Sequence, residues 1–294
     1  MTTAPRIACS ETALNLPLTD AWDLARRCGI EGIEVYGAPD DLQRRLPMLR
    51  SAKRRGVVLS TVCVGPPFLG RADADEIAQV VRALRRSISV TGGLEVSGIV
   101  LPVAAPPAFD STRTTFQPAL REALADLADH ARSVGTTVLL EPLNRYEDGL
   151  INRLEQAVHL CEEIGSASLG VVADWFHMNI EESDMGQAIR AAGGRLRHVH
   201  VADSNRRQPG AGHLDVLALL DALRSIGFDG WLALECSLDD PVETTLRDSA
   251  RALRGAWERL DAPGGTTSAW GWQDDVPPSS SAAPGPAFAS ATER

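Results

Sequence analysis

The sequence of 294 residues has few of the features that mark secreted or membrane proteins. Its five cysteines are scattered and never form a Cys-x-x-Cys pair, so they predict neither a disulfide framework nor a zinc knuckle. The apolar runs fall well short of the roughly 18 residues that a membrane span needs. The first ten residues lack the basic and apolar segments of a secretory signal. We therefore expect a cytoplasmic protein with no membrane partner.

The chain also lacks an excess of positive charge and a glycine-rich phosphate-binding loop after its first apolar run. The chain has 29 basic and 39 acidic residues, a formal net charge of −10. A duplex-binding protein needs a basic footprint to meet the phosphates, so we predict no nucleic-acid partner. The first apolar run is followed by Ser-Glu-Thr-Ala-Leu rather than by Gly-x-Gly-x-x-Gly, which disfavours a doubly wound dinucleotide-binding fold.

The chain does contain a regular alternation of short β-rich runs and amphipathic helical stretches, eight of each. Such alternation predicts βαβ units and a parallel sheet. Eight units in about 260 residues have the size of a (β/α)8 barrel, with an open doubly wound sheet as the alternative. We therefore predict a TIM barrel over residues 1–262. Strands are expected near residues 6–9, 32–36, 57–64, 98–103, 137–141, 169–174, 198–202 and 231–235.

Residues 263–294 differ from the rest in composition. They are rich in Gly, Pro, Ser and Ala and show no apolar periodicity, which is typical of a disordered tail. Trp270 and Trp272 are the exceptions, with docking on the body or on a partner subunit as the alternative to a mobile tail.

Charged residues stand at the ends of the last four expected strands, where the active site of such a barrel forms. They are Glu141, Asp174, His200 and Glu235. One such residue can be a structural cap, but four in register on consecutive strands argue against coincidence. Three carboxylates and one imidazole suit Mn²⁺ or Mg²⁺, with Co²⁺ or Zn²⁺ as further alternatives. We expect Mn²⁺ as the cofactor.

Polar residues that follow these strands are candidates for contacts with a substrate. His177 and Arg206 are placed to hold hydroxyl or enolate oxygens, and Glu147 to accept a hydrogen bond from a hydroxyl. The alternatives are a solvated surface arginine and simple turn chemistry at Glu147. We expect His198 to face the opposite side of its strand from His200 and to be structural.

Four segments carry a resemblance to a known family: EPLNRYEDGLINR, DWFHMNIEE, HVHVADSNRRQPGAGHLD and GFDGWLALE. They resemble the sugar phosphate isomerase/epimerase superfamily, the xylose isomerase-like barrels, and within it most closely the D-tagatose and D-psicose 3-epimerases. The resemblance implies that the four strand-end residues are metal ligands and that His177, Arg206 and Glu147 contact the substrate. It also implies a sugar or polyol ketone substrate and a homo-oligomer, a dimer or tetramer.

The reaction implied by this resemblance is metal-dependent epimerisation. Glu141 and Glu235 would stand on opposite faces of the carbon next to a ketose carbonyl, and would exchange its proton through a metal-stabilised cis-enediolate. Inosose isomerase or dehydratase, hydroxypyruvate isomerase and a lyase on oxidised sugars are alternatives. An endonuclease IV-like nuclease fits less well, because no histidine precedes His130. A non-enzymatic barrel would leave the acidic cluster without a role.

One departure from the ketose epimerases concerns the sugar pocket. The first strand carries no aromatic residue, whereas the family typically places one there as a wall of the pocket. Trp175 and Phe176 are expected to supply a wall instead, with the core as the alternative position for both.

Overall fold

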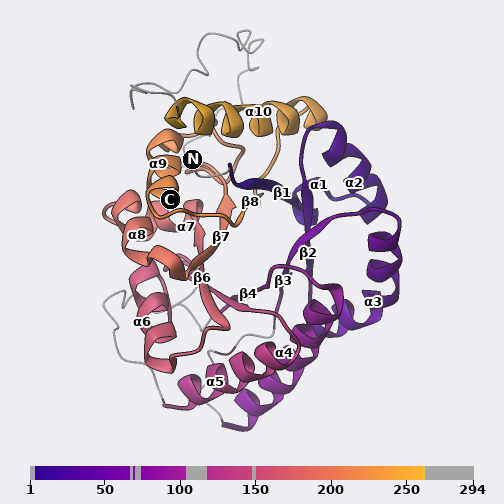
Figure 1. The fold of residues 1–294 in the computed structure, drawn as a ribbon, viewed down its shortest axis with the longest axis vertical. Coiled ribbons are helices and arrows are strands. Elements are labelled where there is room, and N and C mark those ends of the chain that lie inside the picture. Colours follow the sequence, from indigo (N-terminus) through magenta and orange to yellow (C-terminus); the bar gives the residue numbers. More distant parts are fainter. Residues whose placement is uncertain (1–3, 67–68, 70–73, 104–117, 148–149, 262–294) are drawn as a thin grey trace, which may run out of the picture.

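The computed structural model describes residues 4–66, 69, 74–103, 118–147 and 150–261. Eight parallel strands pair in chain order, and the last pairs with the first, so the sheet closes into a barrel (Figure 1). This architecture confirms the predicted (β/α)8 barrel. The strands are β1 (Arg6–Ser10), β2 (Gly32–Gly37), β3 (Leu59–Val64), β4 (Ile99–Pro102), β5 (Val138–Glu141), β6 (Leu169–Asp174), β7 (Leu196–Val201) and β8 (Trp231–Leu234).

The strands form where the sequence places short apolar runs rich in Val, Ile and Leu. Every residue of β3, β4, β5, β6 and β8 is buried. Burial on both faces is what a parallel sheet needs when helices cover its outside and side chains fill its inside. All eight strands begin and end within two residues of their expected positions.

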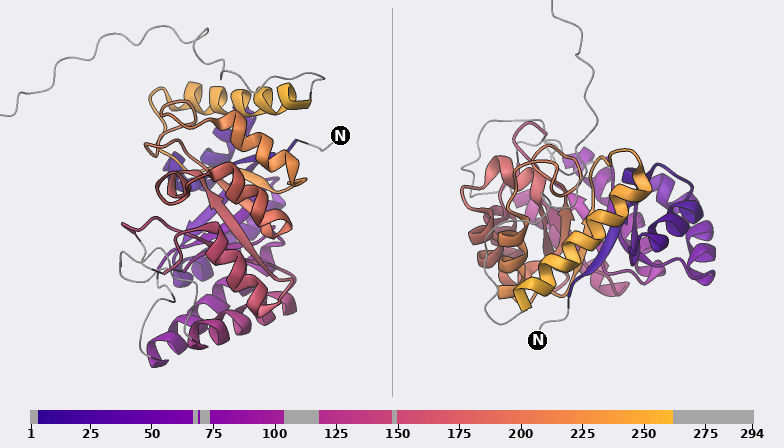
Figure 2. Two further views of the ribbon diagram at one scale, coloured as in Figure 1. Left: turned by 90° about the vertical axis from the view of Figure 1, so that its left-hand side faces the viewer. Right: turned by 90° about the horizontal axis from the view of Figure 1, so that it is seen from above.

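The helices form an outer ring in chain order (Figure 1). The last helix, α10, contacts both α9 and α2 and so closes the ring. Figure 2 shows α10 (yellow) beside the first helices of the chain (indigo). The α-helices are α1 (Glu11–Leu14), α2 (Leu18–Arg27), α3 (Pro39–Arg54), α4 (Ala74–Leu94), α5 (Pro118–Ser133), α6 (Leu154–Ile164), α7 (Trp175–Glu181), α8 (Met185–Ala192), α9 (Val216–Ser225) and α10 (Val242–Asp261).

The described residues hold more α-helices than the eight that the sequence predicted. The short helices α1 and α7 follow directly on β1 and β6, and the last residue of each strand caps the helix. Ser10 accepts a hydrogen bond from the backbone N–H of Thr12, and Asp174 accepts from those of Phe176 and His177. Helices of four and seven residues are too short for apolar periodicity to reveal them.

Two hydrophobic layers hold the barrel together. The larger one lies between the outer faces of the strands and the helices. The smaller one lies inside the barrel, where Leu139, Val172 and Ala233 stand two residues before the charged ends of their strands and therefore face the same way.

No helix among the described residues is both long enough and apolar enough to cross a membrane. The expected tail, 263–294, with Trp270 and Trp272, lies outside the described residues. The domain boundary after residue 262 stays a prediction.

Candidate metal and substrate site

The ends of four adjacent strands bring the charged candidates together. Glu141 ends β5, Asp174 ends β6, His200 lies in β7, and Glu235 directly follows β8. Because neighbouring strands run parallel, their carboxyl ends meet at one mouth of the barrel. Each of the four side chains offers one ligand atom, and these atoms all lie within 4.8 Å of one another.

His200 is at the centre of this cluster. Its Nδ1 lies 2.7 Å from Glu141 Oε1 and 3.2 Å from Glu235 Oε2. The nearest carboxylate oxygen of Asp174 is 3.8 Å away. His200 and Asp174 are completely buried, whereas the Glu235 side chain retains 18% of its exposure. Glu235 therefore marks the side of the cluster that is open to the mouth.

Arg206 reaches into the cluster from the loop after β7. Its guanidinium donates to Asp174 Oδ2 and to Glu235 Oε2, each at 2.7 Å. It also lies over the Phe176 ring, 4.9 Å from the ring centre. A guanidinium that joins two carboxylates has a fixed orientation, because its planar fork matches both bonds at once.

The loop that carries Arg206 is built around Asp203. The buried Asp203 carboxylate accepts backbone N–H groups from Ser204, Gly210 and Leu214 at 2.7–3.2 Å. Arg206 itself has a φ of +60°, a left-handed conformation that is unfavourable for a residue with a Cβ. Such local strain persists where the surroundings over-determine it, which is common at functional sites.

His177 and Glu147 are linked to the cluster through Asn144. The backbone N–H of Asn144 donates to His177 Nδ1 at 3.2 Å, and its side-chain amide donates to Glu147 Oε1 at 2.8 Å. His177 Nε2 faces Asp174 Oδ2 at 3.6 Å. His177 is buried, and Glu147 is exposed at the mouth. The structure thus aligns a graded row of polar groups from the buried cluster toward solvent.

Trp175 and Phe176 were both expected at the wall of the sugar pocket, but the structure places only Phe176 near the site. Trp175 is completely buried and belongs to the core between sheet and helices, so it cannot form a wall of the pocket. Phe176 is half-buried and lies against Arg206 and His177. Two consecutive residues at a helix start point in different directions, and only one of them can face the mouth.

The position expected for His198 was wrong. Residues two apart on a strand face the same side, so His198 points into the barrel with His200. The two rings lie 5.0 Å apart, edge to face, and both are completely buried.

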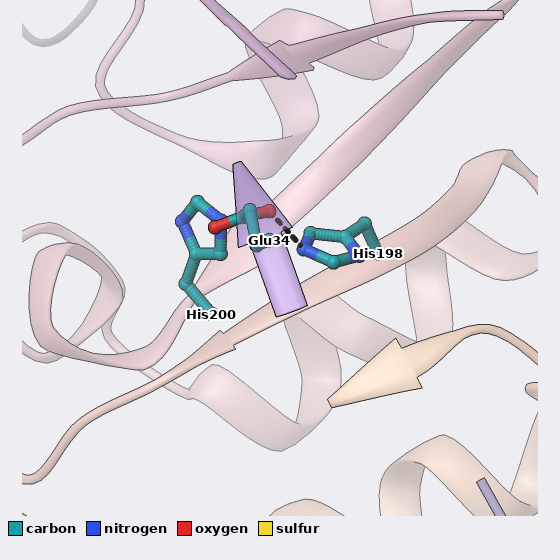
Figure 3. Close-up of side chains that lie close together, drawn as sticks. All are labelled: Glu34, His198 and His200. Carbon is teal, nitrogen blue, oxygen red and sulfur yellow. Dashed lines mark hydrogen bonds and ion pairs between the residues drawn. The ribbon is translucent and has the colours of Figure 1, made fainter. Parts of the chain in front are cut away.

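Two residues that the sequence analysis missed complete the surroundings of the site. Glu34, on β2, lies between the two histidine rings of β7 (Figure 3). A charged residue between Ile33 and Val35, in the middle of a short apolar run, is a signal that was available in the sequence. Asn144 lies in a polar loop, where no pattern distinguishes it.

The charges in the cluster shift the pKa values of its members. Burial opposes ionisation of Asp174, but Arg206 and the two neighbouring histidines outweigh it and hold the pKa of Asp174 at about 2. Burial raises the pKa of Glu141 above its usual value. For His200, burial alone would lower the pKa. The surrounding carboxylates, of which Glu235 has the largest effect, outweigh burial, so the pKa of His200 lies well above its usual value. Arg206 and His200 thus offset part of the buried negative charge.

The residues present fit a divalent cation. Three carboxylate oxygens and one imidazole nitrogen form a hard donor set of the kind that Mn²⁺ and Mg²⁺ accept. A cation would also balance the buried negative charge, which is costly when it is left uncompensated.

Comparisons with known proteins agree with this geometry. Residues 22–256 match the family described as xylose isomerase-like TIM barrel. The chain is 34% identical over 210 residues to an L-ribulose 3-epimerase from Mesorhizobium japonicum, and the aligned region covers 69% of each protein. It is 32% identical over 249 residues to a 3-dehydro-D-guloside 4-epimerase from Escherichia coli, and this aligned region covers 78% of this chain and 91% of that protein.

A solved structure supports the same relationship. The apo crystal structure of the 3-keto-D-glucoside 4-epimerase from E. coli matches with a TM-score of 0.74 at 27% identity, over 85% of this chain and 99% of that one. These named relatives are carbohydrate epimerases, which are isomerases. The chain belongs to the xylose isomerase-like TIM barrel family, because the family match spans most of its length.

Proposed function

We propose that the protein is a divalent-metal-dependent sugar epimerase that inverts a carbon next to a ketone. The observation that carries this proposal is the placement of two carboxylates from non-adjacent strands, Glu141 and Glu235, against the same nitrogen of His200 at 2.7 and 3.2 Å. Inversion through proton exchange needs two proton-transfer groups that approach one carbon from opposite sides.

The roles of the two glutamates follow from this placement. One carboxylate removes the proton from the carbon next to the ketone, which leaves an enediolate. The other returns a proton to the opposite face, which inverts the centre. A divalent ion held by Glu141, Asp174, His200 and Glu235 would polarise the ketone as a Lewis acid and so acidify the neighbouring C–H bond. Return of the proton to the adjacent carbon instead would give an aldose–ketose isomerisation.

The remaining polar groups are proposed to hold the substrate. Arg206 and the ring N–H of His177 lie beside the cluster and would stabilise the negative charge of the enediolate. Glu147, exposed at the mouth and oriented by Asn144, would accept a hydrogen bond from a hydroxyl farther along the chain of the sugar.

The names of the relatives narrow the substrate class. L-ribulose is a ketose with its carbonyl at C2 and is inverted at C3 by the first relative, and a 3-dehydro-guloside has its carbonyl at C3 and is inverted at C4 by the second. Both names describe inversion next to a ketone, which is the reaction proposed here for Glu141 and Glu235. We propose ketoses and 3-keto-glycosides as the substrate class, with Mn²⁺ as the first choice of cofactor. The expected homo-oligomer and cytoplasmic location stay predictions.

Product analysis tests this function. The purified protein, loaded with Mn²⁺, Mg²⁺ or Co²⁺ in turn, is incubated with L-ribulose, D-psicose, D-tagatose, D-fructose and a 3-keto-glucoside, and the products are identified by NMR. We expect at least one substrate to give the epimer at the carbon next to its ketone. Appearance of an unsaturated or deoxy product instead would indicate a dehydratase. No turnover of any substrate by protein shown to contain the ion would reject the function.

A further inference from the structure

Glu34 occupies an unusual position in the middle of the barrel, one layer below the proposed metal site. Its carboxylate is completely buried and has three neighbouring polar side chains, Thr61, His198 and His200. Thr61 Oγ1 donates to Oε2 at 2.6 Å. The two histidine rings flank the carboxylate (Figure 3): His198 Nε2 lies 2.9 Å from Oε2, and His200 Nε2 lies 3.1 Å from Oε1 and 3.3 Å from Oε2. A buried carboxylate with this many partners is held in one orientation.

The two ring nitrogens of His200 face different environments. Nδ1 points at the proposed metal ligands, 2.7 Å from Glu141, while Nε2 points at Glu34. A neutral imidazole carries one N–H, and a carboxylate next to one nitrogen holds the proton there. The other nitrogen then presents its lone pair to a cation, the arrangement by which outer carboxylates orient metal-binding histidines.

We propose that Glu34 is a positioning residue, which holds the ring proton of His200 on Nε2 and leaves the Nδ1 lone pair for the cation. This inference rests on the proposed function, since that function supplies the cation. His198 and Thr61 act on Glu34 rather than on the cation: both contact its Oε2 and so hold the carboxylate in place, with His200 Nε2 at 3.1 Å from Oε1 and 3.3 Å from Oε2.

The same three residues, Glu34, His198 and His200, also bring ligand atoms within 4.8 Å of one another. Two observations favour hydrogen-bonded support over a second ion at this place. All three side chains are completely buried, so no open face is left for water or substrate. In addition, an ion here would need Nε2 of His200, and the ring would lose its last proton if each nitrogen bound a separate ion.

Metal binding tests the inference independently of activity. Wild-type protein and the Glu34→Gln variant are titrated with Mn²⁺ by calorimetry after removal of metal. We expect one ion per chain in the wild type and a dissociation constant about 10–100-fold larger in the variant, the usual cost of losing an outer-shell partner. The neutral amide still fills the space but no longer holds the proton with a full charge.

A second variant covers the case in which Glu34→Gln fails to fold. Thr61→Val keeps the volume of the side chain but removes the donor to Glu34, and we expect it to weaken Mn²⁺ binding in the same direction but less. Thr91→Val is the matched control. Thr91 is also a buried threonine, but its hydroxyl donates to Ser87 within α4, so Mn²⁺ affinity stays unchanged.

A spectroscopic measurement reports the tautomer directly. In Mg²⁺-loaded protein labelled with ¹⁵N-histidine, we expect the His200 signals to show a protonated Nε2 and a Nδ1 without a proton. In Glu34→Gln the Nε2 proton should exchange faster and its signal should shift.

The possible results separate this inference from the function on which it rests. Wild-type affinity and an unchanged His200 signal in Glu34→Gln, or wild-type affinity in Thr61→Val where only that variant folds, would overturn the inference alone. Two ions per wild-type chain, one of them lost in Glu34→Gln, would also overturn it, in favour of a second site. No divalent ion in the wild type would reject both.

Discussion

Arg206 is the residue on which the charges of the site converge. It joins carboxylates from two strands, Asp174 on β6 and Glu235 after β8, through two short hydrogen bonds. We expect Arg206→Ala to lower kcat/KM by about 100-fold or more, as for loss of a preorganised donor to a developing negative charge. Arg206→Lys should recover only part of the loss, because a single ammonium cannot reproduce the planar fork.

The adjacent arginine of the same loop provides the control for this prediction. Arg207 is exposed and pairs with Asp239 instead of with the cluster. Arg207→Ala should therefore leave kcat/KM close to that of the wild type. Steady-state kinetics of the three variants, with melting temperatures to confirm folding, check the assignment, and wild-type kinetics in Arg206→Ala would contradict it.

The lowered pKa of Asp174 predicts how the stability of the metal-free protein depends on pH in acid. Its pKa is about 2 in the folded state, against about 3.9 in an unfolded chain. The folded state therefore binds fewer protons between these values, so the stabilisation is present above pH 4 and is lost as the pH falls from about 4 to 2. Over the whole interval it amounts to about 2–3 kcal/mol of unfolding free energy.

Denaturant unfolding between about pH 2 and 5 in the presence of a chelator measures this effect. Asp174→Asn should flatten the part of the pH dependence that Asp174 causes, whereas Asp221→Asn, at a surface ion pair with Arg224, should change it little. Parallel pH profiles for the wild type and Asp174→Asn would show that Asp174 is not the group responsible.

At the scale of elements, the strands were more predictable than the site they carry. A charged residue that ends an apolar run is conspicuous, which is why Glu141, Asp174 and Glu235 could be found without coordinates. Glu34 interrupts an apolar run instead of ending it, and the first half of the chain resembles the family only in its general barrel pattern. Asn144 could not be found, because its role depends on a hydrogen bond to His177, 33 residues later in the chain.

A helix cap offers a quantitative test at this scale. Asp184 is exposed and accepts a hydrogen bond at 2.8 Å from the backbone N–H of Gln187, in the first turn of α8. Asp184→Ala should lower the free energy of unfolding by about 1 kcal/mol, because it leaves that N–H without its cap, and Asp184→Asn should cost much less. Chemical denaturation of both variants decides the matter, and equal stability of the alanine variant and the wild type would exclude the cap.

At the scale of the whole molecule, closure of the sheet is what creates the site. The candidate ligands come from positions spread between residues 141 and 235 of the sequence, and only the barrel brings their strands side by side. Glu34 joins them from the opposite part of the barrel, since β2 and β7 are not hydrogen-bonded to each other. Inside the barrel, Glu34 on β2 therefore contacts His200, one of the candidate ligands, on β7.

The barrel also buries every cysteine of the chain. Burial raises the pKa of all five thiols, to about 12 for Cys161 and Cys236. Both the lack of access and the scarcity of thiolate slow reaction with a chromogenic disulfide reagent. We expect the native thiols to react at least roughly 1000-fold more slowly than those of the unfolded chain, because reaction must await local opening. Rapid modification of a thiol in the native protein would contradict the packing described above.

The central claim is that Glu141 and Glu235 are the proton-transfer pair of an epimerase. Incorporation of solvent deuterium at the carbon next to the ketone, followed by NMR in D₂O with verified Mn²⁺ loading, measures that proton transfer directly. We predict incorporation by the wild type and by the surface control Glu155→Gln. In Glu141→Gln and Glu235→Gln it should fall by about 100-fold or more, the usual contribution of one acid–base group, while the fold persists. Full exchange in both glutamine variants would contradict the account.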